Sequence, residues 1–588
     1  MRQFFKYVLA TIVGLLLFSV VSFFLFVGII SAIGAASDNE TAVKEKSVLK
    51  LNLNNPIQEV GVENPFEGFG PFNSTGDVIG LIGLKEALAN AALDPNIKGI
   101  YFQAEYPQAG WATLEEVRNA LLEFRKSKKF VYAYGEVMTE KGYYLASAAD
   151  NIYLNPAGAL EWNGLEAEYT FFKGTLDKLN IKPVIFRVGE FKSAVEPFIL
   201  DKMSEASKKQ TASFLNSVND HFIAKVAASR NLDAATLKKL ADDLTIRTPA
   251  DALKAKLVTN VAYYDQVESD MRKKLGIEEK KKIDFVALGK YEKAKKYVEE
   301  GSLKNRIAVI ITQGEIVSGK DDDNIASDRV AEQIRKARLD DKVKAIVLRI
   351  NSPGGSALAS DVMWREIQLA RQAKPVIASM SDYAASGGYY MAMGCNQIVA
   401  QPNTITGSIG IFGMLFNTEG FFRDKLGMTY DRVETNQYAD FPSLTREMSD
   451  FEKGVLQQSV ERGYAIFTTK AAQGRKMPVD SLRKLASGRV WTGSQAKANG
   501  LVDKLGGLED AVKLAAQAAK LKEGDYRVRY TPEKKNAIEE LMKEFTGGDE
   551  EARLSAQLGD LAPYLQYLKK LKNMQGVQAR MPFELDIK

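Results

Sequence analysis

The sequence contains very little of two residues on which many enzyme active sites depend, cysteine and histidine. Its 588 residues include one cysteine, Cys395, and one histidine, His221. A single cysteine excludes an internal disulfide framework and cysteine-rich metal sites. A single histidine excludes metal sites built from several imidazoles and leaves one candidate for a Ser-His-Asp triad. If the protein is an enzyme, its general base is expected to be a residue other than histidine.

The chain also lacks a large net charge. It has 79 lysines and arginines against 74 aspartates and glutamates, which gives a formal net charge of +5. Nucleic-acid-binding proteins usually carry a strongly basic surface, so we expect no nucleic-acid partner. The three aspartates at 321–323 lack the spaced ligands and later glutamate of a calcium-binding loop. We therefore predict neither a metal ion nor a cofactor.

Residues 7–36 carry no charged side chain and are mostly apolar. As a helix this run would be about 45 Å long, more than the ~30 Å of a bilayer core. It is longer than the apolar region of a cleaved signal peptide, although the small residues at its end leave cleavage open. Arg2 and Lys6 precede the run and Asp38 follows it. The positive-inside rule then places residues 1–6 in the cytoplasm and predicts a single-pass signal anchor with a large extracytoplasmic body.

The rest of the chain is a diverged tandem repeat. Residues 97–100 (IKGI) resemble residues 343–346 (VKAI), and the same offset of 246 aligns the GYY at 142–144 with the GYY at 388–390. In each copy, short apolar segments rich in β-branched residues alternate with segments of helical periodicity. This alternation is typical of α/β domains with a mostly parallel sheet.

These patterns predict an α/β fold class with two tandem domains. We place the first domain at residues 46–275 and the second at 305–525. A lysine-rich helical connector is expected at 276–304, because its charges are typical of a solvated face. A helical tail with amphipathic stretches at 537–545 and 561–571 is expected at 526–588.

The first candidate for chemistry is the turn NSPGGS at residues 351–356, which follows a predicted strand and precedes a predicted helix. The backbone amides of Gly354 and Gly355 could point at one oxygen of a ligand, beside the positive end of the helix. The turn therefore predicts an oxyanion hole. A tight structural connection between a strand and a helix would use glycines equally well.

The second candidate is Ser386, in the segment SDYAASGGYY at residues 381–390. Small neighbours leave its hydroxyl accessible at a predicted strand-to-helix turn, as a nucleophile requires, and the Gly387 amide could be a further oxyanion donor. A serine that only caps the helix would give the same pattern.

A comparison of the two copies helps to decide between the catalytic and the structural interpretation of these residues. The first copy has Glu140 where the second has Ser386, and Gln108-Ala109 where the second has Gly354-Gly355. The first copy, however, contains Lys192 in FKSAVEPF at 191–198, while the matching region of the second copy has no lysine. One copy therefore holds a serine and the other a lysine.

A serine and a lysine can form a catalytic dyad in which the neutral amine accepts the proton of the hydroxyl. Neutral Lys192 at pH 7 requires a pKa about 3 units below its usual ~10.4, so burial between the two copies is expected. Glu190 and Glu196 lie close to Lys192 in sequence and could raise its pKa instead. The same sequence pattern would also fit an exposed lysine that forms a salt bridge.

Three further features have ordinary explanations. His221 lies in a predicted helix at 214–226 and is expected to be a packed or surface residue. Cys395 is expected to fill core volume. The segment TITGSIGIFG at 404–413 could pair with an extended peptide by strand addition or form a structural bend.

Taken together, the motifs NSPGGS, SDYAASGGYY, TGSIGIFG (406–413) and FKSAVEPF resemble the long, two-repeat form of signal peptide peptidase A, also called protease IV. The resemblance covers nearly the whole chain and implies two ClpP/crotonase-like domains behind an N-terminal transmembrane helix. It implies Ser386 as the nucleophile and Lys192 as the general base, with oxyanion donors among Gly354, Gly355 and Gly387.

The resemblance also implies a homo-oligomer, a tetramer, in the bacterial inner membrane with the catalytic body on the periplasmic side. Signal-peptide remnants and other short apolar peptides would be its substrates, and membrane lipid would contact the anchor. Two alternatives remain from the sequence. The same fold supports acyl-CoA chemistry, against which the predicted external location argues. The chain could also be an inactive envelope scaffold.

Overall fold

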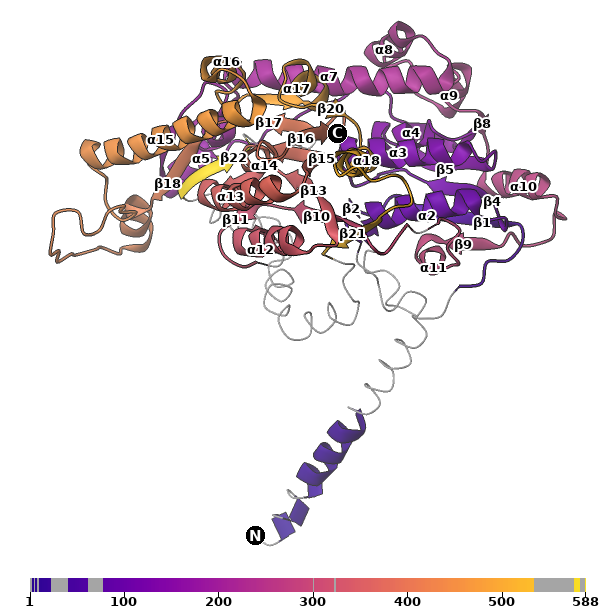
Figure 1. Cartoon of the computed structure of the whole chain (residues 1–588), viewed down its shortest axis with the longest axis horizontal. Helices are drawn as coiled ribbons and strands as arrows, with labels where there is room; N and C mark the ends of the chain where they lie inside the picture. Colours follow the sequence, from indigo (N-terminus) through magenta and orange to yellow (C-terminus); the bar gives the residue numbers. More distant parts are fainter. Residues whose placement is uncertain are drawn as a thin grey trace.

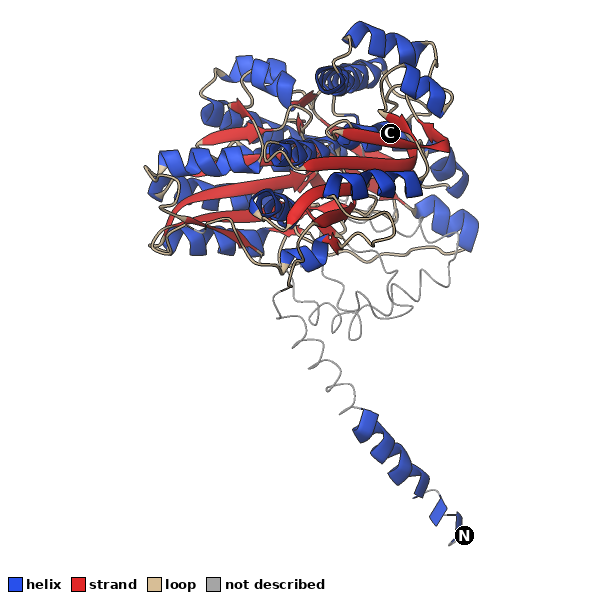
Figure 2. Cartoon of the chain, turned by 90° about the vertical axis from the view of Figure 1, so that its right-hand side faces the viewer, coloured by secondary structure: helices blue, strands red, loops and turns tan. Residues whose placement is uncertain are grey.

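The computed structural model describes residues 3–4, 6–7, 10–22, 41–61, 78–299, 301–321, 324–532, 576–581 and 587. The described chain forms two α/β repeats that lie beside each other, the first indigo to magenta and the second pink to orange in Figure 1. In the perpendicular view, strands run through the middle of the body and helices cover them (Figure 2).

The first repeat is built on a sheet of parallel strands. These strands are apolar on both faces, as expected of a parallel sheet that is covered by helices on both sides. One face packs on α2 (Leu81–Leu93) and α3 (Trp111–Arg125), and the other on α10 (Tyr264–Leu275). Helices α7 (Glu205–Arg230), α8 (Ala234–Asp242) and α9 (Pro249–Lys254) lie in the chain between the sheet strands β6 (Asn151–Leu160) and β8 (Asn260–Val261). The strand order is β8 (Asn260–Val261), β6 (Asn151–Leu160), β5 (Phe130–Met138), β4 (Ile97–Gln103), β1 (Ser47–Asn52), β9 (Phe285–Ala287).

The second repeat has the same plan. Helices α12 (Ser327–Leu339) and α13 (Ala357–Ala373) cover one face of its sheet, and α18 (Leu508–Ala518) covers the other. The strand order is β19 (Val490–Thr492), β17 (Ile405–Gly407), β15 (Val376–Ala385), β13 (Val343–Ser352), β10 (Arg306–Gln313), β21 (Arg527–Thr531), with β16 (Gln397–Ala400) and β20 (Lys504–Leu505) attached through β15. The second repeat also contains α15 (Asp450–Arg475), α16 (Val479–Leu485) and α17 (Gly493–Ala498).

The repeat extends to individual hydrogen bonds. The buried hydroxyl of Tyr143 donates to the carbonyl oxygen of Leu257 at 2.6 Å, and that of Tyr389 donates to the carbonyl oxygen of Leu501 at 3.0 Å. Helices α3 and α13 begin at Trp111 and Ala357, again 246 residues apart. The predicted α/β fold and internal repeat are therefore confirmed.

The edges of the two sheets differ from the prediction. The lysine-rich connector expected to be helical contains β9, which pairs with β1, followed by the short helix α11 (Leu288–Glu292). The segment expected to begin a helical tail contains β21, which pairs with β10. Both edge strands are short and lie among charged residues, so only their long-range partners make them strands. Each repeat thus ends on a strand that returns beside its own first strand.

Other predictions fall partly or wholly on residues that are not described. The amphipathic stretches at 537–545 and 561–571 lie outside the described residues. Of the anchor predicted at 7–36, residues 8–9 and 23–36 also lie outside them, and residues 10–22 are helical. Among the described helices, none combines the length and the apolar character needed to cross a bilayer.

A third sheet joins the two repeats and carries the site described below. Its order is β12 (Ile325–Ala326), β11 (Ile316–Val317), β14 (Gly354–Ser356), β22 (Gly576–Arg580), β18 (Phe412–Asn417), β7 (Lys182–Arg187). Strand β7 comes from the first repeat and β22 from the C-terminal segment, drawn yellow in Figure 1, while the other strands belong to the second repeat. Among the described residues of the first repeat, the counterpart of this sheet is the pair of β2 (Ile57–Gln58) and β3 (Ile79–Gly80).

Candidate active site

Ser386 lies at the sharp turn between β15 and the helix α14 (Gly387–Ala392) and is fully buried in this structure. Its backbone has φ 54° and ψ −106°, a region that a residue with a Cβ rarely adopts. Such a conformation costs on the order of 1–3 kcal/mol and persists only where the surrounding structure imposes it. The Ser386 amide donates to the carbonyl oxygen of Gly407 at 2.8 Å, which ties the turn to β17.

Lys192 reaches Ser386 because a strand of the first repeat crosses into the second. Strand β7 pairs antiparallel with β18 along its whole length, and the chain then turns inward toward Ser386. The backbone of Gly488 lies so close that a Cβ there would be 2.7 Å from the Cβ of Lys192. The Lys192 Nζ donates to the Ser386 Oγ at 2.9 Å within one chain.

Ser408 is a third member of this cluster, and the sequence analysis did not single it out. The Lys192 Nζ lies 3.0 Å from the Ser408 Oγ and 3.1 Å from its carbonyl oxygen. Ser408 has a φ of 49°, which turns both oxygens toward the amine. The only signal for it in the sequence was its position inside the TGSIGIFG motif.

The surroundings of Lys192 favour the neutral amine. The side chain is 0% exposed, and this burial lowers the pKa of Lys192 well below 10.5. Glu190 is exposed, and the carboxylate of Glu196 instead accepts hydrogen bonds from the amide and hydroxyl of Ser204. Among the described residues, no carboxylate forms an ion pair with Lys192, so the expected competition from the two glutamates is not found.

The glycine turn and the start of α14 meet at the same place. Gly354 has a φ of 104°, in the region that favours glycine. A Cβ on Gly354 would lie 2.9 Å from the amide nitrogen of Gly387 and 2.2 Å from the carbonyl oxygen of Ala579. On Gly355, a Cβ would lie 2.2 Å from the carbonyl oxygen of Ile316. Glycine is therefore required at both positions, and the structure brings together the predicted oxyanion residues.

An extended segment of the same chain lies against this turn. Strand β22 pairs antiparallel with β14, with Ala579 opposite Gly355. The amide of Met581 donates to the carbonyl oxygen of Pro353 at 2.6 Å. The other edge of β22 pairs with β18, whose first residues belong to the segment predicted to add an extended strand. The carbonyl oxygen of Ala579 thus lies beside Gly354 and Gly387, as the carbonyl of a bound peptide would.

The remaining candidates lie away from the dyad or fill space. His221 is on α7 and its Nε2 lies 3.0 Å from Glu115 Oε2. Cys395 is buried, and burial raises the pKa of its thiol to about 12. In the described part of the chain there is no group of three or more side chains placed to hold a metal ion. Of the three adjacent aspartates, only Asp321 is described.

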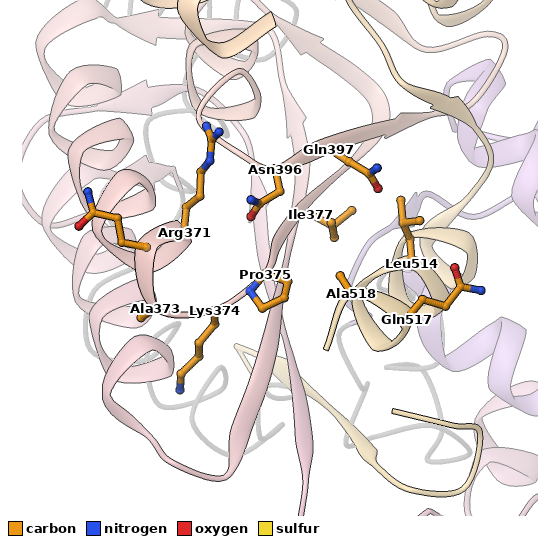
Figure 3. A pocket seen from close by; sticks show the side chains of 11 residues that line it. Arg371, Ala373, Lys374, Pro375, Ile377, Asn396, Gln397, Leu514, Gln517 and Ala518 are labelled. Carbon is orange, nitrogen blue, oxygen red and sulfur yellow. The ribbon is translucent and has the colours of Figure 1, made fainter. Parts of the chain in front are cut away.

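A cavity of about 590 Å³ opens at the opposite end of β15, between the end of α13 and α18 (Figure 3). Its labelled side chains include Arg371, Lys374 and Gln397, and it contains none of the residues named above. At about 3.3 Å per strand residue, the length of β15 separates it from Ser386 by roughly 30 Å. This cavity therefore takes no part in the chemistry at the dyad.

Comparison with known proteins identifies a family for this chain. The model of peptidase family S49 matches residues 123–278 and 368–522, once in each repeat. Protease 4 of Salmonella typhi is 37% identical over 546 residues, which cover 89% of this chain and 87% of that protein. The chloroplastic serine protease SPPA of Arabidopsis thaliana is 34% identical over 487 residues, with 82% of this chain and 70% of that protein covered.

Protease 4 of Haemophilus influenzae is 35% identical over 508 residues, covering 82% of this chain and 81% of that protein. Among solved structures, a ClpP1 mutant from Listeria monocytogenes matches 35% of this chain and 94% of its own, at 14% identity and a TM-score of 0.24.

Proposed function

The chain belongs to peptidase family S49 and is a serine peptidase, and on this basis we propose that Ser386 and Lys192 are its catalytic residues. One observation carries the proposal: the Nζ of a fully buried lysine lies 2.9 Å from the hydroxyl of a serine on a strained turn. A neutral lysine can act as general base at this distance.

The proposed reaction begins when Ser386 Oγ attacks the carbonyl carbon of a peptide bond and its proton passes to Lys192 Nζ. The amides of Gly355 and Gly387, with Gly354 at the turn, stabilise the negative charge on the carbonyl oxygen. The carbon–nitrogen bond then breaks and Lys192 returns the proton to the leaving amine. Water attacks the resulting ester, again with Lys192 as base, and releases the second product and the free serine. Ser408 orients the Lys192 amine throughout.

We propose that the substrate binds as an extended strand in the place that β22 now occupies. The pairing of β22 with β14 and β18, and the position of the Ala579 carbonyl beside the glycines, support this binding mode. Main-chain pairing of this kind gives affinity for many sequences. This binding mode suits short peptides that have no fixed structure.

We further propose that these peptides are signal-peptide remnants and other short apolar peptides at a membrane. The uncharged run at 7–36 supports a single-pass anchor, and the charges around it favour a catalytic body outside the cytoplasm. The location would then be the bacterial inner membrane, with a periplasmic body assembled as a homo-oligomer, a tetramer. An acyl-CoA enzyme or an inactive scaffold is less consistent with a serine hydrogen-bonded to a buried lysine.

The test is hydrolysis of a fluorogenic apolar peptide by full-length protein in detergent. Wild type is compared with Ser386→Ala, Lys192→Met and a control, Lys202→Met, in which an exposed lysine is changed. We expect both site variants to lose at least about 10³-fold in kcat/KM and the control to match wild type. Full activity in Lys192→Met would show that the base lies elsewhere. A folded but inert wild type would favour the scaffold.

A further inference from the structure

A second cleft lies in the first repeat, at the position equivalent to the catalytic cleft of the second. It is a cavity of about 370 Å³ between the two repeats. On one side it is lined by Gln108, Ala109 and Lys141, which are 246 residues before Gly354, Gly355 and Gly387. On the other side it is lined by Tyr383 and Ile405 of the second repeat. The cavity therefore occupies the place where the first repeat would have its own active site.

The strand pairing around this cavity repeats the pairing around Ser386. In the second repeat, β11 and β14 are parallel neighbours at Ile316 and Gly355, and in the first repeat a parallel bridge joins Pro56 to Gln108, one residue before the position that corresponds to Gly355. We call the space between Gln108, Ala109 and Ile587, which all line this cavity, the slot of the first repeat.

One residue of the C-terminal segment, Ile587, already lies at that slot. In the second repeat Gly413 pairs antiparallel with Val577 of β22, and in the first repeat Ala167, 246 residues before Gly413, forms an antiparallel bridge with Ile587. Ile587 is 5% exposed and lines the cavity. Two parts of one C-terminal segment, ten residues apart, thus make equivalent backbone contacts in the two repeats.

The first-repeat cleft lacks the groups for peptide cleavage. Glu140 stands where the second repeat has the nucleophile, and its Oε1 accepts the amides of Asn163 at 2.8 Å and Gly164 at 2.7 Å. Its carboxylate is therefore held by backbone donors, away from the residues that line the cavity. Gln108 and Ala109 also carry side chains where the catalytic turn needs glycine. What remains is a cleft with Glu140 at the nucleophile's position, lined by the apolar side chains of Trp111, Ile405 and Ile587 and by the polar side chains of Asp382 and Asn403.

We propose that the first-repeat cleft, defined by Gln108, Ala109, Lys141, Tyr383, Ile405 and Ala167, is a non-catalytic binding site for extended apolar peptide segments. This inference rests on the proposed function, because the same substrate is cut at Ser386 in the other cleft. Val577 and Ile587 are ten residues apart in sequence and contact the two clefts, so a substrate of similar length or longer reaches both. Shorter peptides occupy the catalytic cleft alone. The protein therefore selects long apolar peptides through the first repeat.

The test uses binding, which does not depend on turnover. In full-length Ser386→Ala protein, fluorescence anisotropy measures the affinity for a labelled 20-residue apolar peptide and for a labelled five-residue peptide of the same composition. Gln108→Trp is added to fill the cleft at an exposed position. Gln397→Trp is the matched control, because Gln397 is equally exposed but lines the separate cavity of Figure 3.

We expect Gln108→Trp to weaken binding of the long peptide about tenfold and to leave the short peptide unchanged, while Gln397→Trp changes neither. Lys141→Glu, which changes the same cleft without adding bulk, is expected to weaken the long peptide as well. Equal affinities of all variants for the long peptide would overturn the inference.

Cleavage of the short peptide by protein with Ser386 intact tests the proposed function separately. If the wild type does not cut it, the catalytic proposal fails, while the binding result still decides the role of the first-repeat cleft. If the wild type and Gln108→Trp cut it equally well, the loss seen with the long peptide belongs to the first-repeat cleft and not to damage at the dyad.

Discussion

At the scale of single residues, the site depends on how two side chains are held. Ser386 is fixed on a turn with positive φ, and Lys192 is fully buried with only hydroxyl and carbonyl partners. Burial penalises the charged amine, so the pKa of Lys192 lies well below 10.5. A lysine on the surface could not serve as a base near neutral pH.

The lowered pKa of Lys192 predicts how peptide hydrolysis and the stability of the fold depend on pH. Lys192 acts as a base only when it is neutral, so kcat/KM is expected to rise with pH through an apparent pKa well below 10.5. Between that pKa and 10.5 the unfolded chain holds the proton that the folded chain has lost, so the stability of the fold also rises with pH in this window. Peptide hydrolysis and urea unfolding across pH measure the two effects.

Lys192→Met removes the titrating amine and should abolish this part of the pH dependence of stability, while Lys202→Met should keep it. If kcat/KM rose only near pH 10.5, the lysine would be an ordinary solvated amine and the proposed dyad would be wrong.

At the scale of secondary-structure elements, β22 is the strand whose placement has the most direct consequence. It lies between β14 and β18 and is held there by backbone pairs and by Arg580, which donates to Glu315 Oε1 at 2.7 Å. The Arg580 side chain is 4% exposed and that of Glu315 is 17% exposed. A charge-assisted bond in such a setting contributes about 1.5–3 kcal/mol.

If β22 occupies the place of the substrate, weakening it should help other peptides to bind. Arg580→Ala is expected to lower KM for an added apolar peptide about tenfold with kcat unchanged, because β22 competes less well. Arg462→Ala, at an exposed position on α15, is the control. Steady-state kinetics with a fluorogenic peptide measure the effect. An unchanged KM together with a lower Tm would mean that β22 is a permanent strand of the sheet and that substrate binds elsewhere.

At the scale of the whole molecule, the site exists only while the two repeats stay together, since each supplies one member of the dyad. Arg349 of β13 lies at their interface with 0% of its side chain exposed. Its guanidinium pairs with Glu59 at 2.9 Å and with Glu116 at 2.8 Å, both from the first repeat and both 1% exposed. Lys85 pairs with Glu116 as well.

Replacing Arg349 should therefore lower the free energy of unfolding. Arg349→Met leaves two buried carboxylates without their main partner, and we expect a loss of about 3–5 kcal/mol in the free energy of unfolding, with loss of activity. The variant that also carries Glu59→Gln and Glu116→Gln leaves no unpaired charge and should recover most of that stability. Chemical denaturation of the three proteins measures this. Equal stability of Arg349→Met and wild type would contradict it.

The same cluster predicts sensitivity to acid. Burial alone would raise the pKa of Glu116, but Arg349 and Lys85 outweigh it and lower the pKa to about 2. A carboxylate with a lowered pKa contributes stability that is present above pH 4.5 and is lost as the pH falls toward 2. Wild type is expected to lose stability in this range, and the variant with both glutamines should lose less.

Local patterns in the sequence determined a large part of this protein. Apolar runs rich in β-branched residues predict the buried parallel strands, the spacing of 246 residues predicts the two repeats, and the glycines around 354–355 and 387 predict a turn where backbone amides are exposed. The strands and the turn depend on residues close together in the chain, so periodicity and turn chemistry are enough to recognise them. The repeats are recognised because similar residues recur at one fixed spacing. Ser386 and Lys192 could be selected because one repeat carries each and the other does not.

Only the tertiary structure decided how distant segments meet. Strands β9, β21 and β22 are at most five residues long and cannot be recognised alone. They are strands because a sheet edge elsewhere in the chain pairs with them. The meeting of Lys192 with Ser386, 194 positions apart, follows from the crossing of β7 into the other repeat. The role of Ser408 and the slot that holds Ile587 likewise depend on backbone contacts between segments far apart in sequence. Local propensity carries no information about such contacts, and the packing of the two repeats supplies it.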